Sequence, residues 1–248
     1  MRIAALFDIH GNVPALDAVL EDVRRAGAER VVVGGDVLPG PMPQEVFSRL
    51  RHLEIPVDYI YGNGEIAVLE QIAGRVPERV PERYRPIIAW TAGQMDAEDR
   101  HLIAGWPKTC ALKIDGLGEV LFCHATPQNE NDIFTKLTPE DRLLPLFEGL
   151  TASVVVCGHT HMQFDRTVGP VRVVNAGSVG MPFGAPGADW LLLGPGAELR
   201  HTEYDLNDAA RQIRETAYPW PDGDFAGRYI LNPPTLEEML AIYSQVST

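Results

Sequence analysis

The chain has 248 residues, 45% of them hydrophobic, and a net charge of −13. A chain of this length buries roughly three quarters of its unfolded surface, so its core needs no disulfides. The negative charge disfavours a nucleic-acid groove as the main surface, although bound divalent ions would reverse the field locally for an anionic substrate. The three cysteines form no C-x-x-C pair, so neither a disulfide framework nor a zinc ribbon is indicated, and Cys123 and Cys157 are expected in the core.

The first part of the chain alternates strand-like and helix-like stretches. Short runs of Val, Ile, Leu and Ala favour strands, and apolar residues at helical spacing between them favour helices. This βαβαβ order predicts parallel strands that are joined by right-handed crossovers. The predicted elements are a strand over 2–7, a helix over 14–26, a strand over 30–33, a helix over 43–53 and a strand over 57–61.

Residues 66–105 differ from the rest because they are rich in Arg and Glu and contain three prolines. We expect two or more helices with a kinked connection, placed as an insertion that partly caps the site described below. No apolar run of about 18 residues exists, so no transmembrane helix is predicted.

The second half is predicted to be mainly strands, separated by Gly and Pro turn signals. Further helices are expected over 139–147, 206–216 and 235–244, the last two making up a helical C-terminal segment, 205–248. Because no stretch resembles a linker, we interpret 1–248 as one domain with two packed sheets. The strands are expected over 109–114, 120–123, 153–157, 163–168, 171–175 and 190–193.

Metal-type side chains follow several of these apolar runs. Strands that end at one edge of a sheet deliver their next residues to one place. Seven nitrogen and oxygen ligands are too many for one tetrahedral ion and suit two ions that share a ligand. The pattern indicates hydrolysis at phosphorus. The candidates are Asp8, His10, Asp36, Asn63, His124, His159 and His161.

Taken singly, most of these residues have ordinary structural explanations. Asn63 would by default occupy a turn, and His124 alone would more often be a hydrogen-bonded core histidine. The pair His159 and His161 favours metal binding by itself, because two imidazoles one residue apart have few structural explanations. The strength of the prediction lies in the order of the whole set.

In that order the sequence resembles the calcineurin-like metallophosphoesterases, especially their small stand-alone bacterial and archaeal phosphodiesterase-like members. The resemblance implies an α/β fold (α+β by some schemes), a four-layer α-β-β-α sandwich of two mixed sheets flanked by helices. The motifs that carry it are Asp8-Ile9-His10-Gly11-Asn12, Gly35-Asp36, Gly62-Asn63-Gly64-Glu65, Cys123-His124, Gly158-His159-Thr160-His161 and Asn175-Ala176-Gly177-Ser178-Val179-Gly180.

The resemblance also implies a role for each ligand. Catalysis would rest on Asp36, Asn63 and His124, with a hydroxide that bridges two metal ions attacking phosphorus in line. Mixed imidazole and carboxylate ligands suit two divalent transition-metal ions, Mn first, with Fe, Ni, Zn or Co as alternatives. Asp8, His10 and His161 would hold the first ion, Asn63, His124 and His159 the second, and Asp36 both.

One motif departs from the family pattern. Many members carry a histidine that protonates the leaving group at the position of Gly64. Loss of a general acid lowers the rate of hydrolysis by roughly 10²–10⁴-fold when the leaving group is poor. His101, in the insertion, is a weak substitute that is better explained as an exposed helix residue. Glu65 is expected either to support a ligand from behind or merely to begin a helix.

Substrate contacts are predicted for Asn12, Gly64, Arg83 and Tyr84, the last two if the insertion caps the site. A turn is the alternative role for Asn12, and a solvated helix face is the alternative for Arg83. The glycine-rich loop 175–180 has two interpretations as well. It presents backbone N–H groups to a phosphate, or it forms a structural turn.

The predicted function is a dinuclear metal-dependent phosphoesterase that hydrolyses phosphodiesters or small phosphomonoesters in the cytoplasm. Its partner would be a small phosphate ester or a nucleotide, with no membrane or nucleic acid; the oligomeric state stays open, a homo-oligomer being one option. A nucleotide or dinucleoside polyphosphate hydrolase is one alternative. A silent binding or scaffold protein with the same fold is another, supported only by Gly64.

Overall fold

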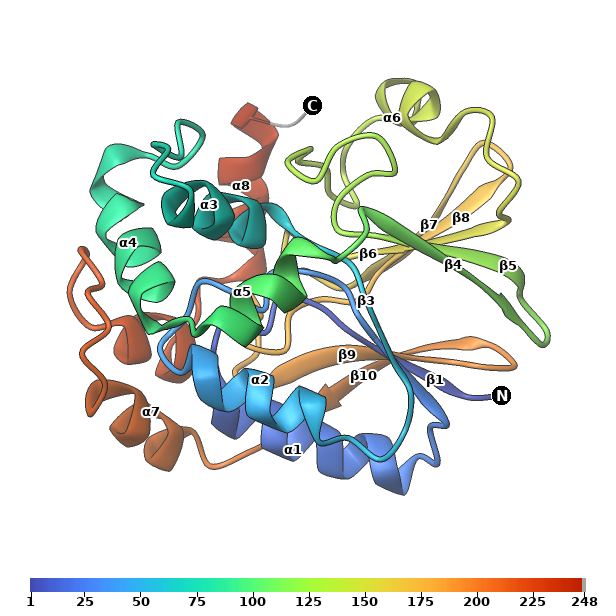
Figure 1. Cartoon of the computed structure of the whole chain (residues 1–248). Helices are drawn as coiled ribbons and strands as arrows, with labels where there is room; N and C mark the ends of the chain where they lie inside the picture. The colour runs from blue at the N-terminus through green and yellow to red at the C-terminus, as the bar shows by residue number, and fades with distance from the viewer. Residues whose placement is uncertain (247–248) are drawn as a thin grey trace.

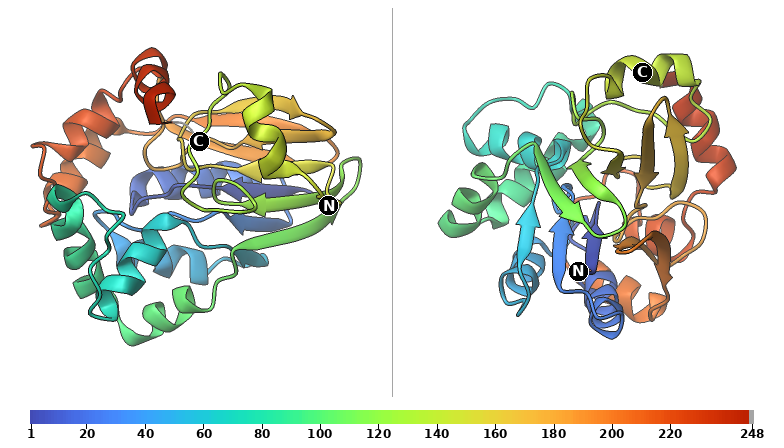
Figure 2. Two further views of the ribbon diagram at one scale, coloured as in Figure 1. Left: turned by 90° about the horizontal axis from the view of Figure 1, so that it is seen from above. Right: turned by 90° about the vertical axis from the view of Figure 1, so that its right-hand side faces the viewer.

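Two five-stranded sheets pack face to face in the computed structural model, which describes residues 1–246, and helices cover their outer sides (Figure 1). The right-hand view of Figure 2 shows α1 and α6 on opposite sides of the sheet pair. The predicted four-layer α-β-β-α sandwich is therefore confirmed. No helix of residues 1–246 is long and apolar enough to cross a membrane.

The first sheet has the strand order β10-β9-β1-β2-β3. Its βαβαβ half is parallel, as predicted, whereas β9 pairs antiparallel with β1 and β10 pairs antiparallel with β9. The elements are β1 (Ile3–Leu6), α1 (Val13–Arg25), β2 (Arg30–Val33), α2 (Pro43–Arg51), β3 (Val57–Tyr59), β9 (Ala188–Leu193) and β10 (Ala197–Thr202).

The second sheet has the order β4-β5-β6-β8-β7 and is also mixed. Strands β5, β6 and β8 run parallel, whereas β4 and β7 are antiparallel edge strands. Its elements are β4 (Thr109–Ile114), β5 (Gly118–Cys123), α6 (Glu140–Phe147), β6 (Val154–Cys157), β7 (Phe164–Val168) and β8 (Val171–Asn175).

Alternating side chains of the strands supply three separate core layers. Ala4 and Leu6 of β1 pack under the helices, whereas Ile3 and Ala5 of β1 and Phe7, just after it, pack between the two sheets. In the second sheet, the same alternation sends one set of side chains inward and the other toward α6. Because the buried positions of the central strands each belong to one layer, the register of these strands is fixed, and so are the positions of their ends.

The predicted insertion forms helices, although the first begins earlier than expected. Helix α3 starts at Asn63, so a candidate ligand occupies its first turn. The insertion and the C-terminal helices lie at the same end of the molecule (Figure 1). The elements are α3 (Asn63–Ile72), a 3₁₀ turn (Glu82–Tyr84), α4 (Arg85–Gln94), α5 (Ala97–Ala104), α7 (Leu206–Arg214), a π-helix (Ala226–Leu231) and α8 (Leu236–Val246).

Two elements were absent from the sequence-based prediction. Strand β10 is mostly exposed and reads Ala-Glu-Leu-Arg-His-Thr, so it has only two apolar residues and too short an alternation to predict a half-buried strand. The π-helix over Ala226–Leu231 has no simple periodicity that distinguishes it from a loop. Helix boundaries otherwise differ from the predicted ranges by a few residues, as fraying ends do.

Candidate metal centre

The candidate ligands gather where parallel strands of both sheets end. Asp8 and His10 follow β1, and Asp36 follows β2. His124 follows β5, and the loop with His159 and His161 follows β6. The carboxyl ends of the two sheets face each other at this point, so residues far apart in sequence meet there.

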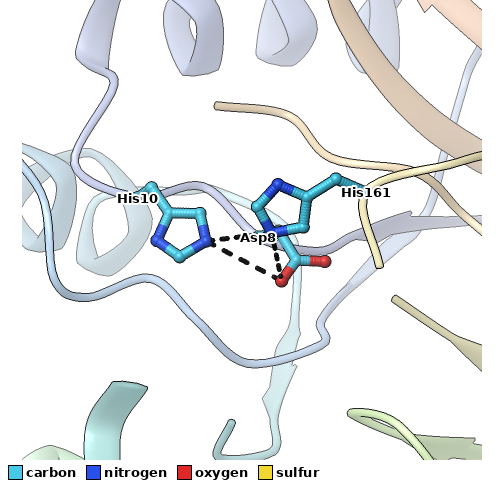
Figure 3. A group of neighbouring side chains, drawn as sticks. All are labelled: Asp8, His10 and His161. Carbon is cyan, nitrogen blue, oxygen red and sulfur yellow. Dashed lines mark hydrogen bonds and ion pairs between the residues drawn. The ribbon is translucent and has the colours of Figure 1, made fainter. Parts of the chain in front are cut away.

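The ligand atoms fall into two groups. Within each group one ligand atom per residue lies within 4.8 Å of the others. Figure 3 shows the first group, in which Asp8 Oδ1 faces the Nε2 atoms of both histidines. Asn63 adjoins the second group, since its Oδ1 lies 3.1 Å from His124 Nε2. The groups are Asp8, His10 and His161, and Asp36, His124 and His159.

Asp36 belongs to the second group and also faces the first. Its Oδ1 is 3.5 Å from His124 Nε2, and its Oδ2 is 3.8 Å from His10 Nε2. The Gly64 N–H donates to Oδ1 at 2.7 Å and fixes the carboxylate orientation. One oxygen therefore faces each group, which is the placement that a shared ligand requires.

Three of the four candidate histidines are oriented through Nδ1. His10 Nδ1 lies 3.1 Å from the Pro39 carbonyl, His124 Nδ1 2.9 Å from that of Gly34, and His161 Nδ1 2.9 Å from that of Met181. A carbonyl only accepts, so Nδ1 carries the proton in these pairs. In the neutral imidazole, the form that binds a metal ion, Nε2 then keeps a lone pair that points into the site.

The polar atoms of the centre lack adequate partners without a cation. Asp8 Oδ1 is buried and has no hydrogen-bond donor among residues 1–246. The Nε2 atoms of His10 and His161 lie 3.2 Å apart, although both are acceptors in the tautomer that their Nδ1 contacts select. A buried acceptor without a donor costs about 1–3 kcal/mol. The residues therefore fit a divalent cation in each group.

The backbone at the candidate ligands is strained. Within residues 1–246, five non-glycine residues have φ between 45° and 67°, and all five belong to the candidate set. Such left-handed conformations cost about 1–3 kcal/mol each and concentrate at functional sites. The five are Asp8, His10, Asp36, His159 and His161.

The charges of the centre suit a cation as well. Burial raises the pKa of Asp8, but the nearby His161 and His124 outweigh it and hold that pKa below its usual value. Burial likewise opposes ionisation of Asp36, yet His124 and His10 keep its pKa far below the usual range. Burial lowers the pKa of His124, but Asp36 and Asp8 reverse this effect and raise it to about 10. At neutral pH, metal binding would therefore displace a proton from His124.

Glu65 supports the ligand loops from behind. Its buried carboxylate accepts hydrogen bonds from the backbone N–H groups of Asp36 at 2.8 Å, Leu38 at 3.0 Å and Gly62 at 2.7 Å. It thereby joins the loop that carries Asp36 to the turn before Asn63. Burial, followed by the Asp36 charge, raises the pKa of Glu65 to about 7. Of the two roles that the sequence allowed, the structure favours support of a ligand.

Replacing Glu65 with Gln is expected to loosen both loops, because an amide N–H₂ group would face a backbone N–H donor. One or two buried donors would lose their acceptor, at about 1–3 kcal/mol each. We expect a melting temperature lowered by several degrees in EDTA and a Mn²⁺ affinity lowered by roughly 10–100-fold, measured by calorimetry. An unchanged melting temperature and Mn²⁺ affinity would show that the three hydrogen bonds contribute little. Glu70→Gln, in the same helix, is the control.

Asn12 does not have the predicted substrate contact. Its side chain is fully buried and caps α1, with Oδ1 accepting from the Ala15 N–H at 3.2 Å. Its Nδ2 donates to the Gly180 carbonyl and to the Tyr204 hydroxyl. Asn12 therefore has a structural role, although as the N-cap of α1 rather than as the turn residue that was the alternative.

The glycine-rich loop 175–180 also has a structural role. The N–H groups of Val179 and Gly180 donate to the carbonyls of Phe7 and Asp8, both at 2.9 Å. Ser178 Oγ donates to the same Asp8 carbonyl at 2.8 Å. These N–H groups hold the backbone of the first ligand in place and are not free for a phosphate.

Gly64 sits in a position that only glycine fits. A Cβ atom built there would lie 2.0 Å from the Leu38 carbonyl oxygen and 3.0 Å from Asp36 Oδ1. The histidine that many family members carry cannot be accommodated in this backbone arrangement. His101 is exposed on α5. Within residues 1–246, no histidine outside the candidate set lines the hollow that opens beside the candidate ligands, described next.

A hollow of about 310 Å³ opens beside the candidate ligands, and we call it the ring hollow. Residues of the insertion line this hollow, and Tyr84 is one of them. Arg83 is not part of the wall: it faces Asp222 and lies over the ring of Tyr84. The arginine of this wall is Arg79, which lies in no motif and was not predicted to be a site residue. Apolar and aromatic residues of both the insertion and the C-terminal segment enclose the hollow, among them Val80, Tyr84, Ile88, Tyr218, Trp220 and Phe225.

Comparison with known proteins places this geometry in a family. The family described as "Calcineurin-like phosphoesterase superfamily domain" matches residues 1–193. An uncharacterized protein of Methanocaldococcus jannaschii is 27% identical over 238 residues, which cover 88% of this chain and 93% of that protein. Phosphodiesterase YfcE of Escherichia coli is 28% identical over 198 residues, which cover 78% of this chain and 87% of that protein.

Solved structures agree with the sequence matches. A metallophosphoesterase from Sphaerobacter thermophilus superimposes with a TM-score of 0.67 at 25% identity, covering 92% of this chain and 99% of that one. A hypothetical protein from Pyrococcus horikoshii has the same fold, with a TM-score of 0.76 at 21% identity over 88% of this chain and 94% of that one. The chain belongs to the calcineurin-like phosphoesterase superfamily.

Proposed function

We propose that the protein is a dinuclear metal-dependent phosphodiesterase, with Mn²⁺ as the expected metal. The observation that carries this proposal is the pair of ligand groups on either side of Asp36. Asp8, His10 and His161 would hold one ion, Asn63, His124 and His159 the other, and Asp36 both. The preference for diesters is supported by the resemblance to phosphodiesterase YfcE.

Divalent ions bound here would polarise the phosphate oxygens and lower the pKa of water so that it can attack phosphorus. The residues of the chain contribute the rest. Backbone carbonyls direct the histidine Nε2 atoms inward, and the Gly64 N–H and the Glu65 carboxylate hold Asp36 in position. Asp36 and Asp8 keep the centre anionic, so it attracts cations and admits an anionic ester only when they are bound.

The test is hydrolysis of bis-p-nitrophenyl phosphate by protein freed of metal with EDTA and then loaded with Mn²⁺, Ni²⁺, Co²⁺, Zn²⁺ or Mg²⁺. We expect p-nitrophenolate release with at least one transition metal, strongest with Mn²⁺, and none above background in EDTA. A panel of phosphate monoesters and nucleotides run in parallel reports the ester preference. If the metal-loaded protein is inactive on the whole panel, the enzyme hypothesis is rejected in favour of a binding or scaffold protein with the same fold.

The same metals are expected to raise the melting temperature, because a ligand that binds only the folded state stabilises it by about 2.7 kcal/mol at a hundred times its Kd. The measurement is a thermal scan of the EDTA-treated protein with increasing Mn²⁺. Absence of any shift up to millimolar Mn²⁺ would contradict metal binding at the two groups.

A further inference from the structure

The ring hollow is not the only depression that reaches the candidate metal centre. A second hollow of about 640 Å³, which we call the polar hollow, adjoins it. Asn63 and Arg79 line both hollows. The two depressions therefore meet at a candidate metal ligand and at one arginine.

The walls of the two hollows differ in chemistry. Charged and amide side chains line much of the polar hollow, including Glu70, Arg75, Glu78 and Asn131, and apolar side chains such as Ile66 and Val76 complete its lining. Aromatic rings line the ring hollow, and they come from two segments that are remote in sequence. Flat rings offer edge-to-face and offset contacts to another ring, beyond the burial of apolar area. The size of the ring hollow is near the lower end of the roughly 300–1,000 Å³ of small-molecule pockets.

The aromatic wall is held together across these two segments. The Tyr84 hydroxyl of the insertion donates to Asp222 of the C-terminal segment at 2.8 Å. The rings of Tyr84 and Trp220 lie 5.4 Å apart, and so do those of Trp90 and Tyr218. The C-terminal part of this wall lies beyond the residues 1–193 that match the family model.

Arg79 is the cation available to a phosphate at the junction. Within residues 1–246 its guanidinium has no ion pair or side-chain hydrogen bond, whereas Arg83 faces Asp222 and Arg85 Nε donates to the Val80 carbonyl at 3.2 Å. An unpaired guanidinium beside a metal centre presents a planar fork of donors to phosphate oxygens.

We propose that the substrate is a phosphodiester with an aromatic ring on one substituent, which binds in the ring hollow, while Arg79 contacts the phosphate and the other, polar substituent enters the polar hollow. A monoester would fill one hollow and leave the other to solvent. This inference rests on the proposed function for the position of the phosphate at the centre, but its test measures binding and does not depend on turnover.

The test compares phenylphosphonate, cyclohexylphosphonate and methylphosphonate, which are not esters and are not hydrolysed, by calorimetric titration into the Mn²⁺-loaded protein. We expect phenylphosphonate to bind at least about tenfold more tightly than methylphosphonate, and more tightly than the cyclohexyl compound, whose ring is not flat. Equal affinities of phenyl- and methylphosphonate would overturn the ring site. Equal affinities of the phenyl and cyclohexyl compounds would overturn its preference for an aromatic ring.

A substitution in the aromatic wall tests the ring site, and a substitution of Arg79 tests the phosphate contact. Trp220→Leu should reduce the preference for phenylphosphonate by about threefold or more and leave methylphosphonate affinity unchanged, with Tyr84→Leu as a second variant should the first not fold. Tyr59→Leu is the control, since Tyr59 stacks on Trp106 and lines neither hollow. A preference unaffected by both wall substitutions would contradict the assignment of the hollow.

Arg79→Leu should lower the affinity for all three phosphonates by a similar factor of about ten, because it removes a contact to the phosphonate group and no contact to the ring. Arg83→Leu, which removes an arginine of the same segment that lines neither hollow, should change none of them. An unchanged affinity in Arg79→Leu would remove Arg79 from the site. Inactivity on bis-p-nitrophenyl phosphate together with an intact ring preference would contradict the proposed function and leave the ring site standing.

Discussion

Asp36→Asn is expected to lower kcat/KM for bis-p-nitrophenyl phosphate by at least about a thousandfold in the presence of Mn²⁺. Mutation of residues that only support a metal ligand lowers metal affinity or activity by roughly 10–100-fold. A larger loss is expected for Asp36, because it faces both ligand groups directly. An asparagine removes the negative charge and one of the two oxygens that a shared ligand needs. The same expectation holds for His124→Ala, which removes an Nε2 directed into the second group.

Binding and folding are measured beside activity in this experiment. Calorimetry should show that Asp36→Asn loses tight binding of at least one Mn²⁺ ion, while the far-ultraviolet circular dichroism stays unchanged. Asp141→Asn, an exposed carboxylate in the first turn of α6, is the matched control and should behave as wild type. Activity of Asp36→Asn within tenfold of wild type would rule out a shared ligand at this position.

Gly64→Ala is expected to destabilise the protein and abolish its activity. The added Cβ would lie 2.0 Å from the Leu38 carbonyl oxygen, so the backbone of one of the two ligand loops must move. Overpacking in a well-packed region costs about 1–3 kcal/mol, and this contact is with backbone, which yields little. Gly64→His should fail for the same reason, and so should not restore the family's general acid.

The control for this substitution is Gly93→Ala in α4, where a Cβ meets no atom within 4 Å. Alanine there should be neutral or stabilise by up to about 1 kcal/mol, because glycine is the poorer helix former. Urea denaturation in EDTA measures both variants. A Gly64→Ala protein as stable and as active as wild type would contradict the close approach of Leu38.

Much of the site was predictable because the ligands follow strands. The strands before Asp8, Asp36 and His159 are short apolar runs, and parallel strands bring their ends together. The order of the ligand types then identified the family. What the sequence did not indicate was which of several polar residues have free side chains. Asn12 and the loop 175–180 carry suitable groups, but hydrogen bonds within the fold already use them.

The substrate side of the site was less predictable for a different reason. Arg79, Arg83 and Arg85 lie within one polar stretch, and only the packing of the insertion against the C-terminal segment distinguishes them. Trp220 belongs to a segment with neither a motif nor a clear periodicity. Such walls form through contacts between remote parts of the chain, which single-sequence patterns do not report.

Each ligand group draws on both sheets. The first takes Asp8 and His10 from the end of β1 and His161 from the end of β6, and the second takes Asp36 from β2 and His124 from β5. An ion in either group would thus act as a cross-link across the seam of the sandwich. Loss of both ions would free the sheets to slide at this edge, so amide exchange at the ends of β1 and β6 should accelerate together on chelation, ahead of the outer strands.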